Sequence, residues 1–340
     1  MHHMLLYCRE MRTRRLSFFL APILLAAIPG CLFVNQPPEI SFSLELLTAA
    51  SVSVVAPEGW VHYEWHFGDG STAEGPRVEH AYEEPGEYTI DLKAISVDGV
   101  AAFDHQVVFV HRDIRVIASR ALPPEYLQDV VDEAEAGDML LIEGEFVGNT
   151  VIDEPITLRG PCTLISAGAG PALLITGDGV TLEEIAFEGS GDEATAGGAL
   201  RLMSAAIRAI DCSFEGHSGF SGAAICMIES RSVFTDCTFS DNHADVDGGA
   251  VYCEGDEAFP TFRSCKFLEN TADAGGAIAV RATTHVSLDA VPLRVEDCVF
   301  EQNRATAAEA GGAVHVGHTC RLSLEGCTFT SNGLQDVVYE

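Results

Sequence analysis

The chain has very few lysines and is short of positive charge altogether. Only Lys93 and Lys266 are lysines, and 19 Lys+Arg stand against 51 Asp+Glu, for a formal net charge of −32 over 340 residues. Such a charge repels nucleic acid and anionic lipid headgroups, which argues against a DNA- or RNA-binding role. An acidic surface keeps an exposed protein soluble, and it can also collect divalent cations.

Long apolar runs are scarce as well. The one notable run, residues 16–28, lies near the N-terminus and follows Arg9, Arg12, Arg14 and Arg15. It is shorter than a membrane-spanning helix and has the length and flanks of a signal peptide. No second run of spanning length follows it, so we expect the rest of the chain to be extracytoplasmic.

The signal segment ends in Ile28-Pro29-Gly30-Cys31. These four residues resemble the processing box of bacterial lipoproteins. The resemblance implies that residues 1–30 are removed, that Cys31 is lipidated, and that residues 31–36 link it to the first domain. It also implies a location in the outer membrane or at the cell surface, because Leu32 rather than an aspartate follows the cysteine. The alternatives are ordinary secretion and an uncleaved anchor.

Short alternating apolar runs, separated by turn-forming clusters, fill residues 37–112. This pattern predicts a small antiparallel, Ig-like β-sandwich. Two segments resemble the PKD (polycystic-kidney-disease) domain: Trp65, Phe67, Gly68, Asp69 and Gly70, and then His80, Tyr82, Pro85, Gly86 and Tyr88. We expect Trp65 and Phe67 in the core and a tight turn at Gly68 to Gly70, with Asp69 bonding its own backbone. The resemblance implies an extracellular spacer or adhesion module, so His80 and Tyr82 are interpreted as structural.

The rest of the chain, after a linker at 113–120, indicates a second all-β domain over 121–340. Leu127, Val130, Val131 and Ala134 have helical spacing, and Gly137 can end that helix. Short strands follow. Residues 121–137 are expected to form a helix that covers the first coil. This order, a helix followed by short strands, resembles the N-terminal end of right-handed, single-stranded parallel β-helix proteins of the pectin-lyase-like fold.

A phrase of Cys, Phe and Asn recurs roughly every 29 residues over about 185–333, followed by Gly-Gly or a related pair. Such a period is typical of stacked coils, and it predicts one ladder for each residue type. The predicted cysteine and phenylalanine ladders point inward and comprise Cys212, Cys237, Cys265, Cys298, Cys327, Phe214, Phe239, Phe267, Phe300 and Phe329. The predicted amide ladder lies at a turn and comprises Asn242, Asn270, Asn303 and Asn332. These repeats resemble those of polymorphic outer-membrane adhesins.

None of the eleven cysteines has the Cys-x-x-Cys spacing of zinc or redox sites. We interpret the ladder cysteines as reduced core residues, although neighbouring coils are close enough for some bridges. Cys226 and Cys253 are the best candidates for a disulfide.

The parallel β-helix also hosts enzymes that act on acidic polysaccharides, so an active site has to be considered. Glycosidases with this fold commonly carry an adjacent Asp-Asp pair, a Gly-His-Gly and an Arg-x-Lys. This chain has no Asp-Asp pair and no Arg-Ile-Lys, and Gly216-His217 and Gly317-His318 match the Gly-His-Gly only in part. A lyase base among Arg201, Arg231, Arg263 and Arg281 stays open. Asp241, Asp245, Asp247 and Asp256 could bind Ca²⁺ on a loop face, but we favour the interpretation that they are solvated acidic loop residues. No other cofactor is expected.

We therefore expect a non-catalytic, lipid-anchored surface protein for adhesion, envelope structure or carbohydrate binding, with a surface polysaccharide or a protein as partner. The alternative is a polysaccharide lyase or glycoside hydrolase acting on an acidic polysaccharide. A groove lined by clustered Arg, His and carboxylates favours the enzyme, whereas a face of Ser, Thr, Ala and scattered acids favours the binder.

Overall fold

The computed structural model describes residues 40–339 apart from 119–125, 169, 190–195, 257–258, 283–291, 308–310, 319 and 334. The predicted signal peptide, the lipidation residue Cys31 and the linker 31–36 lie outside the described residues. The chain forms two compact units that divide between Arg112 and Asp113. Among the described residues, no helix is long and apolar enough to cross a membrane.

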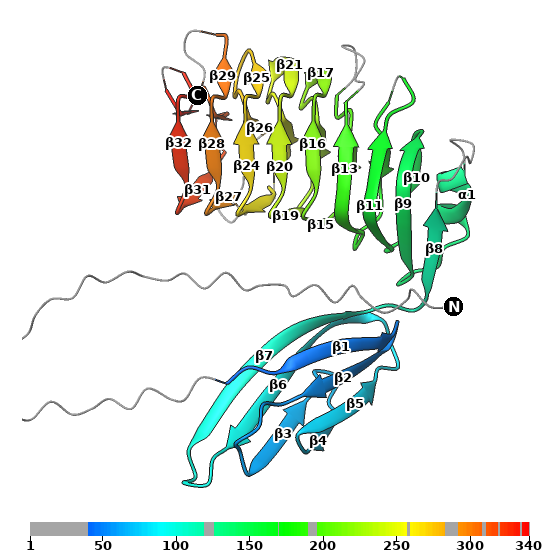
Figure 1. Ribbon diagram of the computed structural model, residues 1–340. Coiled ribbons are helices and arrows are strands. Elements are labelled where there is room, and N and C mark those ends of the chain that lie inside the picture. The colour runs from blue at the N-terminus through cyan, green and yellow to red at the C-terminus, as the bar shows by residue number, and fades with distance from the viewer. Residues whose placement is uncertain are drawn as a thin grey trace, which may run out of the picture. The chain divides into compact units, whose positions relative to one another are not determined.

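The first unit is a sandwich of two antiparallel sheets (Figure 1). One sheet has the order β1-β2-β5, with bounds Ser43–Thr48, Ser51–Val55 and Arg77–Ala81. The other has the order β4-β3-β6-β7, with bounds Thr72–Glu74, His62–His66, Gly86–Ile95 and Ala101–Val110. Residues two apart on a strand share a face, so Trp65 and Phe67 both enter the core, where they are almost completely buried.

The second unit is a solenoid of parallel strands, whose largest sheet has fourteen strands. Its first strands are long: β8 (Ile114–Ala118), β9 (Met139–Val147), β11 (Thr157–Ile165) and β13 (Thr181–Glu188). Beyond β13 each coil contributes two short strands instead of one. The first of each pair are β15 (Arg208–Ile210), β19 (Val233–Thr235), β23 (Thr261–Arg263), β27 (Leu293–Glu296) and β31 (Leu322–Glu325). The second are β16 (Ser213–Glu215), β20 (Thr238–Ser240), β24 (Lys266–Leu268), β28 (Val299–Glu301) and β32 (Thr328–Thr330).

Two further parallel sheets complete each coil. The eight-stranded sheet contains β10 (Thr150–Ile152), β12 (Leu173–Ile175), β14 (Leu200–Met203), β18 (Ile225–Ile228), β22 (Val251–Glu254), β26 (Ile278–Arg281), β30 (Val314–Val316) and β33 (Val337–Tyr339). A four-stranded sheet contains β17 (Ser218–Ser221), β21 (His243–Asp247), β25 (Thr271–Ala272) and β29 (Arg304–Ala305). Glycines make the bend between these sheets: Gly248 has φ 62°, and a Cβ on it would collide with the carbonyl of Val251.

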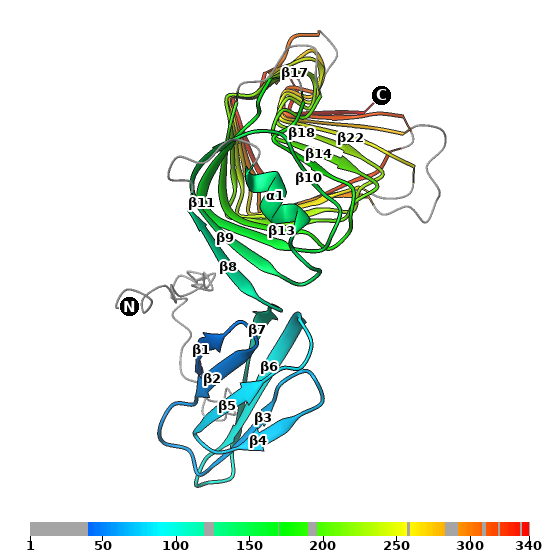
Figure 2. The same ribbon diagram turned by 90° about the vertical axis from the view of Figure 1, so that its right-hand side faces the viewer.

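The helix α1 (Tyr126–Asp132) covers the first coil, as Figure 2 shows. Leu127 and Val131 are buried in the solenoid core. The segment predicted as a linker, residues 113–120, contains a strand. Ile114–Ala118 form β8, which pairs in parallel with β9 and extends the large sheet.

Phenylalanine rings stack along the inside of the solenoid. The rings at positions 214, 239, 267, 300 and 329 lie 4.7–4.9 Å apart and are nearly parallel. Phe187, which the repeat analysis missed, extends this stack by one coil at 4.8 Å. Cys212, Cys237, Cys265 and Cys298 lie buried beside the rings, and Cys327 and Phe329 in the last coil are partly exposed.

The asparagines form a continuous, buried amide ladder. Asn242 Nδ2 donates to Asn270 Oδ1 at 2.9 Å, and Asn270 repeats this bond to Asn303 at 2.9 Å. Asn303 in turn donates to Asn332 at 2.9 Å. Each Oδ1 also accepts the backbone N–H of the preceding asparagine, at 3.0–3.1 Å. The turn that starts each bend is therefore locked to the next coil by side chains as well as by backbone.

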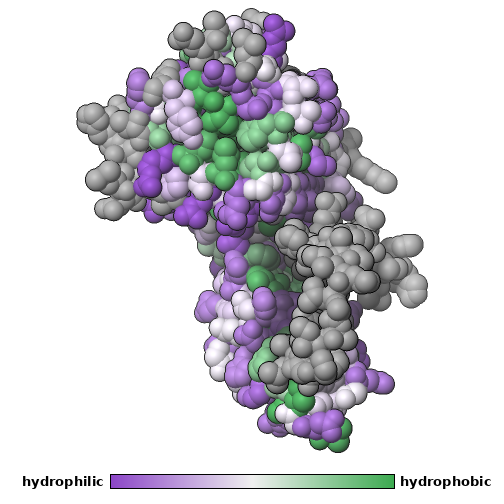
Figure 3. All heavy atoms as spheres, turned by 90° about the vertical axis from the view of Figure 1, so that its left-hand side faces the viewer, coloured by the Kyte–Doolittle hydropathy of each residue, from purple (hydrophilic) through white to green (hydrophobic). Residues whose placement is uncertain are grey.

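Apolar side chains gather on the end of the solenoid that contains β31, β32 and β33 (Figure 3). Leu324 is 39 % exposed and Tyr339 is 60 % exposed. These three strands are the outermost of their sheets in the described part of the chain.

Candidate functional site

The Gly-Asp-Gly turn of the sandwich brings three chemically active side chains together, those of Asp69, Ser71 and His80. Asp69 Oδ1 accepts bonds from the Ser71 backbone N–H (2.9 Å) and hydroxyl (2.5 Å), and Asp69 Oδ2 lies 2.8 Å from His80 Nε2. Partial burial opposes ionisation of Asp69, but the bonds from Ser71 and His80 outweigh it and lower its pKa to about 2.

This arrangement is not a hydrolase triad. A triad needs the carboxylate on one imidazole nitrogen and the hydroxyl on the other. Here Nε2 of His80 faces both Asp69 and Ser71. The His80 ring stacks on Phe67 at 4.1 Å, so the three groups hold the turn against the core.

The aromatic residues of the second PKD segment hold the same region. The Tyr82 hydroxyl donates to the carbonyl of Phe67 at 3.1 Å, and its ring stacks on Tyr88 at 4.3 Å. The Tyr88 hydroxyl donates to the carbonyl of Glu84, next to Pro85 and Gly86, where β6 begins. All of these contacts are structural.

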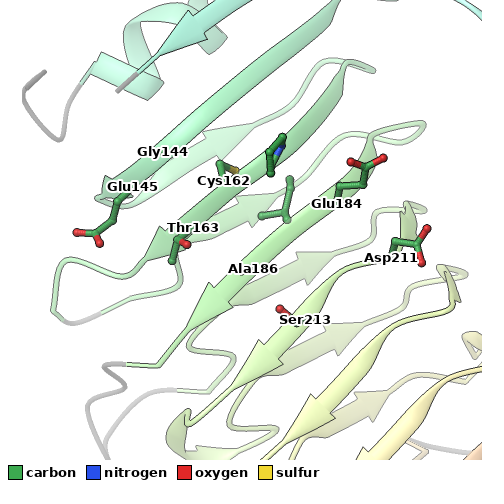
Figure 4. A pocket seen from close by; sticks show the side chains of 10 residues that line it. Gly144, Glu145, Cys162, Thr163, Glu184, Ala186, Asp211 and Ser213 are labelled. Carbon is green, nitrogen blue, oxygen red and sulfur yellow. The ribbon is translucent and has the colours of Figure 1, made fainter. Parts of the chain in front are cut away.

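A broad hollow of about 570 Å³ lies on the outer face of the large sheet, over β9, β11, β13 and the start of β16. Its floor contains Thr163, Ala186 and Ser213, which are in register in successive coils. Figure 4 shows Glu145 at one end of the hollow and Glu184 and Asp211 at the other. The outward-facing column of small residues, Thr163, Ala186 and Ser213, therefore leaves an open space on the sheet, and carboxylates lie at both ends of it.

The backbone explains where these carboxylates lie. Glu184 and Asp211 have φ of 56° and 53°, and the same left-handed bend recurs at Asp236 and Asp297. Aspartate tolerates this conformation better than most residues because its short side chain can bond locally. Beyond β13, the bends at Asp211, Asp236 and Asp297 separate the two short strands of a coil and carry an exposed acidic side chain, whereas Ser264 occupies the bend of the coil between the last two.

Burial and neighbouring like charges raise the pKa values of two carboxyl groups in this region. Partial burial, followed by the carboxylates of Asp236 and Glu184, raises the pKa of Asp211. Burial also raises the pKa of Glu183, and the nearby Arg159 guanidinium opposes that shift. Arg159 contacts both Glu183 (3.5 Å) and Glu184 (3.1 Å). The hollow thus offers carboxylate and hydroxyl oxygens as hydrogen-bond acceptors, with its nearest cation already paired.

No group of three or more His, Cys, Asp or Glu suited to a metal ion occurs within the described ranges. Of the four aspartates considered for Ca²⁺, Asp247 is bound on both oxygens by Arg281 at 2.9 Å. Asp245 lies 3.8 Å from His243. The described aspartates are therefore not brought together around one point.

The sequence-derived catalytic candidates are dispersed. His217 is buried at the start of the amide ladder, where its backbone N–H donates to Asn242, and burial lowers its pKa to about 4. It is neutral at pH 7 and shielded from solvent. Arg263 is paired with Glu296 at 2.9 Å, Arg281 is paired with Asp247, and Arg231 is exposed in a turn. Arg201 lies on the eight-stranded sheet.

The disulfide proposed between Cys226 and Cys253 is wrong, because all described cysteines are free thiols. Cys226 is in register with Tyr252, whereas Cys253 is in register with Met227. Successive residues of a strand point to opposite faces, so Cys226 faces outward and Cys253 faces the core. The 27-residue spacing exceeds the local coil by one residue. Burial raises the pKa of Cys226 to about 11 and that of Cys162 to about 12, so neither is a reactive thiolate.

These observations define the class: an all-β protein with a small antiparallel sandwich followed by a parallel β-solenoid, as predicted. Residues 161–338, more than half of the chain, match the family described as right handed beta helix region, and the chain belongs to that family. Residues 34–110 match the PKD domain, which is typical of extracellular and surface proteins.

Three solved structures are similar to parts of the chain. The PKD1 domain of the Vibrio cholerae metalloprotease PrtV is 25% identical, with 22% of this chain and 98% of that chain covered and a TM-score of 0.20. The PKD1 domain of Vibrio anguillarum Epp is 27% identical, with 22% and 95% covered and a TM-score of 0.21. A family 28 exopolygalacturonase from Yersinia enterocolitica is 8% identical, with 90% and 98% covered and a TM-score of 0.30. No curated protein matches.

Proposed function

We propose that the protein is a non-catalytic cell-surface lipoprotein that binds an uncharged or amine-bearing carbohydrate. The observation that carries this proposal is the hollow on the large sheet. Its floor of Thr163, Ala186 and Ser213 and its rim of carboxylates form a face of small polar groups and acids. Carboxylates and hydroxyls accept hydrogen bonds from sugar hydroxyls and amines, whereas they repel polyuronates.

The positions of the acidic groups support binding over catalysis. Hydrolysis of a glycosidic bond needs one protonated and one ionised carboxyl group on opposite sides of that bond. Glu184 and Asp211 occupy neighbouring bends of one column at one end of the hollow, so a sugar chain lying on the floor would meet both from the same side. Glu145 lies at the opposite end, and the activity screen below tests whether it acts together with either of them.

The binding test compares two matched substitutions. Ala186→Leu fills the floor of the hollow, and Thr238→Leu adds bulk to the same outward column outside the hollow. We expect Ala186→Leu to abolish retention on immobilised neutral or amino polysaccharides and Thr238→Leu to leave it unchanged. Equal retention of both variants would contradict the proposal.

The rival activity is tested with the purified ectodomain on pectate, alginate and glycosaminoglycans, with and without calcium. We expect no product. Formation of unsaturated or reducing-end products would overturn the non-catalytic assignment and favour a lyase or hydrolase.

The anchor is proposed from the residues around Cys31. We expect labelled palmitate to enter the parent protein and to be lost in Cys31→Ala. A parent protein without label would leave ordinary secretion or an uncleaved signal segment as the explanation.

A further inference from the structure

Arg201 stands out among the cations of this acidic protein. It lies on β14 and projects from the outer face of the eight-stranded sheet, in register with Leu174 and Cys226 of the neighbouring coils. The residue is partly buried, and its Nε is buried without a hydrogen-bond partner in the part of the chain that the structure describes. A buried donor without a partner is destabilising, so it calls for an explanation.

The surroundings of Arg201 are mainly apolar. Met203, two residues along the same strand and on the same face, is 41 % exposed. Its register partner in the next coil is Ile228, which is partly exposed. With Leu174 and Cys226, these side chains surround the guanidinium by aliphatic groups and a protonated thiol. Within the described part of the chain, the register neighbours of Arg201 on both sides therefore carry no negative charge.

Carboxylates farther along the same face are already engaged. Asp247 binds Arg281 through both oxygens at 2.9 Å, and Glu254 accepts the Tyr252 hydroxyl at 3.2 Å. Arg281 shows how this fold satisfies an outward arginine when the pairing is internal. Arg201 also faces outward from this sheet, and no carboxylate of the described ranges pairs with it in this way.

We propose that Arg201, Leu174, Met203 and Ile228 form a binding surface for an extended protein segment that carries a carboxylate flanked by aliphatic side chains. The guanidinium, whose buried Nε has no partner among the described residues, complements the carboxylate, which would form charge-assisted hydrogen bonds with the part of the guanidinium that is exposed to solvent. The aliphatic neighbours favour a peptide over a sugar, because they offer no partners for hydroxyl groups. This surface lies on a different sheet from the hollow and is independent of its proposed ligand.

The experiment uses two synthetic peptides, acetyl-Val-Leu-Glu-Leu-Val-amide and its Gln counterpart, with sodium acetate as a third arm. Binding is followed by the NMR signal of the Arg201 Nε–H, assigned by its loss in Arg201→Met. We expect a saturable shift with the Glu peptide and about tenfold or greater weakening with the Gln peptide. Arg201→Met should lose affinity to the same extent, whereas Arg294→Met, an exposed arginine of the large sheet, should not.

A second readout separates binding from a structural role. Because the buried Nε of Arg201 has no partner among the described residues, Arg201→Met should keep or raise the urea midpoint while it removes peptide binding. A lowered midpoint would indicate that Arg201 supports the fold and would overturn the proposal. Equal affinity for the two peptides, unchanged affinity in Arg201→Met, or the same shift with acetate alone, an adventitious ion only, would each overturn it too.

Discussion

Replacement of Asn270 is the sharpest test of how the solenoid holds together. Its side chain is fully buried and makes four hydrogen bonds. Nδ2 donates to Asn303 Oδ1 (2.9 Å) and to the carbonyl of Phe239 (3.0 Å). Oδ1 accepts the backbone N–H (3.1 Å) and the Nδ2 (2.9 Å) of Asn242.

Asn270→Ala removes all four bonds and fills none of the space. It leaves the buried backbone N–H of Asn242 without an acceptor, which costs about 2 kcal/mol, and each of the other lost bonds adds about 0.5–1 kcal/mol. The expected loss of solenoid stability is therefore about 4 kcal/mol.

Asn270→Asp adds a dependence on pH. A carboxylate there would still accept from Asn242, but its second oxygen would face two acceptors, Asn303 Oδ1 and the Phe239 carbonyl. Burial and this geometry raise the folded-state pKa of the new acid above its unfolded value. The variant should accordingly be least destabilised below about pH 4 and lose stability as pH rises through neutrality.

The assay is urea denaturation followed by two signals. Far-UV circular dichroism reports mainly on the solenoid, and tryptophan fluorescence reports on the sandwich alone, because Trp60 and Trp65 both lie there. The circular dichroism midpoint should fall in both variants while the fluorescence midpoint stays constant. Glu301→Ala, an exposed change on β28, is the matched control. A midpoint for Asn270→Ala equal to that of Glu301→Ala would refute the ladder reasoning.

Three further predictions concern other parts of the chain. Tyr82→Phe removes the hydroxyl bond to Phe67 and should lower the stability of the sandwich by about 1 kcal/mol, seen as a lower fluorescence midpoint, and an unchanged midpoint would show that this bond contributes nothing. The pKa of Asp69 is about 2 instead of the ordinary 3.8, so its contribution to stability is complete above pH 3.8 and is lost as pH falls toward 2. Asp69→Asn should therefore flatten the acid end of the stability profile measured by fluorescence. A profile like that of the parent protein would contradict this. Reduction should leave the mass of the purified ectodomain unchanged, and native thiols at pH 8 should react far more slowly than denatured ones, whereas a Cys226–Cys253 bridge found by peptide mapping would show that the register is wrong.

The repeat alone was enough to predict the inward side of the solenoid. A coil packs on a near copy of itself, so a recurring Phe or Asn has only its counterpart above and below as a neighbour. Phe187 was missed because the amide ladder starts later, with His217 in the first place and no asparagine before it. The Cys226–Cys253 pairing failed for a related reason: coil lengths vary, and an error of one residue exchanges the two faces of a strand.

The hollow could not have been found from sequence, because it depends on which small residues become neighbours across coils. Thr163, Ala186 and Ser213 are unremarkable in the chain and meet only through the register of β11, β13 and β16. The residue type of Arg201 predicts at most a lyase base. What distinguishes it is that its register neighbours among the described residues, Leu174 and Cys226, carry no carboxylate, and only the stacking of the coils makes them neighbours.

Both proposed surfaces include the coil that runs from Thr181 to Ile210, and packing gives a reason. Farther along the stack, outward positions are occupied by pairs that satisfy one another across coils, such as Arg263 with Glu296 and Arg281 with Asp247. In the earlier coil, Ala186 faces outward from one sheet and Arg201 from another. Ala186 is too small to fill the space above it, and the Nε of Arg201 has no hydrogen-bond partner among the described residues. Since inward positions are fixed by the ladders, a coil can acquire a ligand only where its outward side chains leave space or charge unmatched. The proposed binding functions therefore fall where the outward pairing is interrupted, while the inward ladders continue unchanged beneath them.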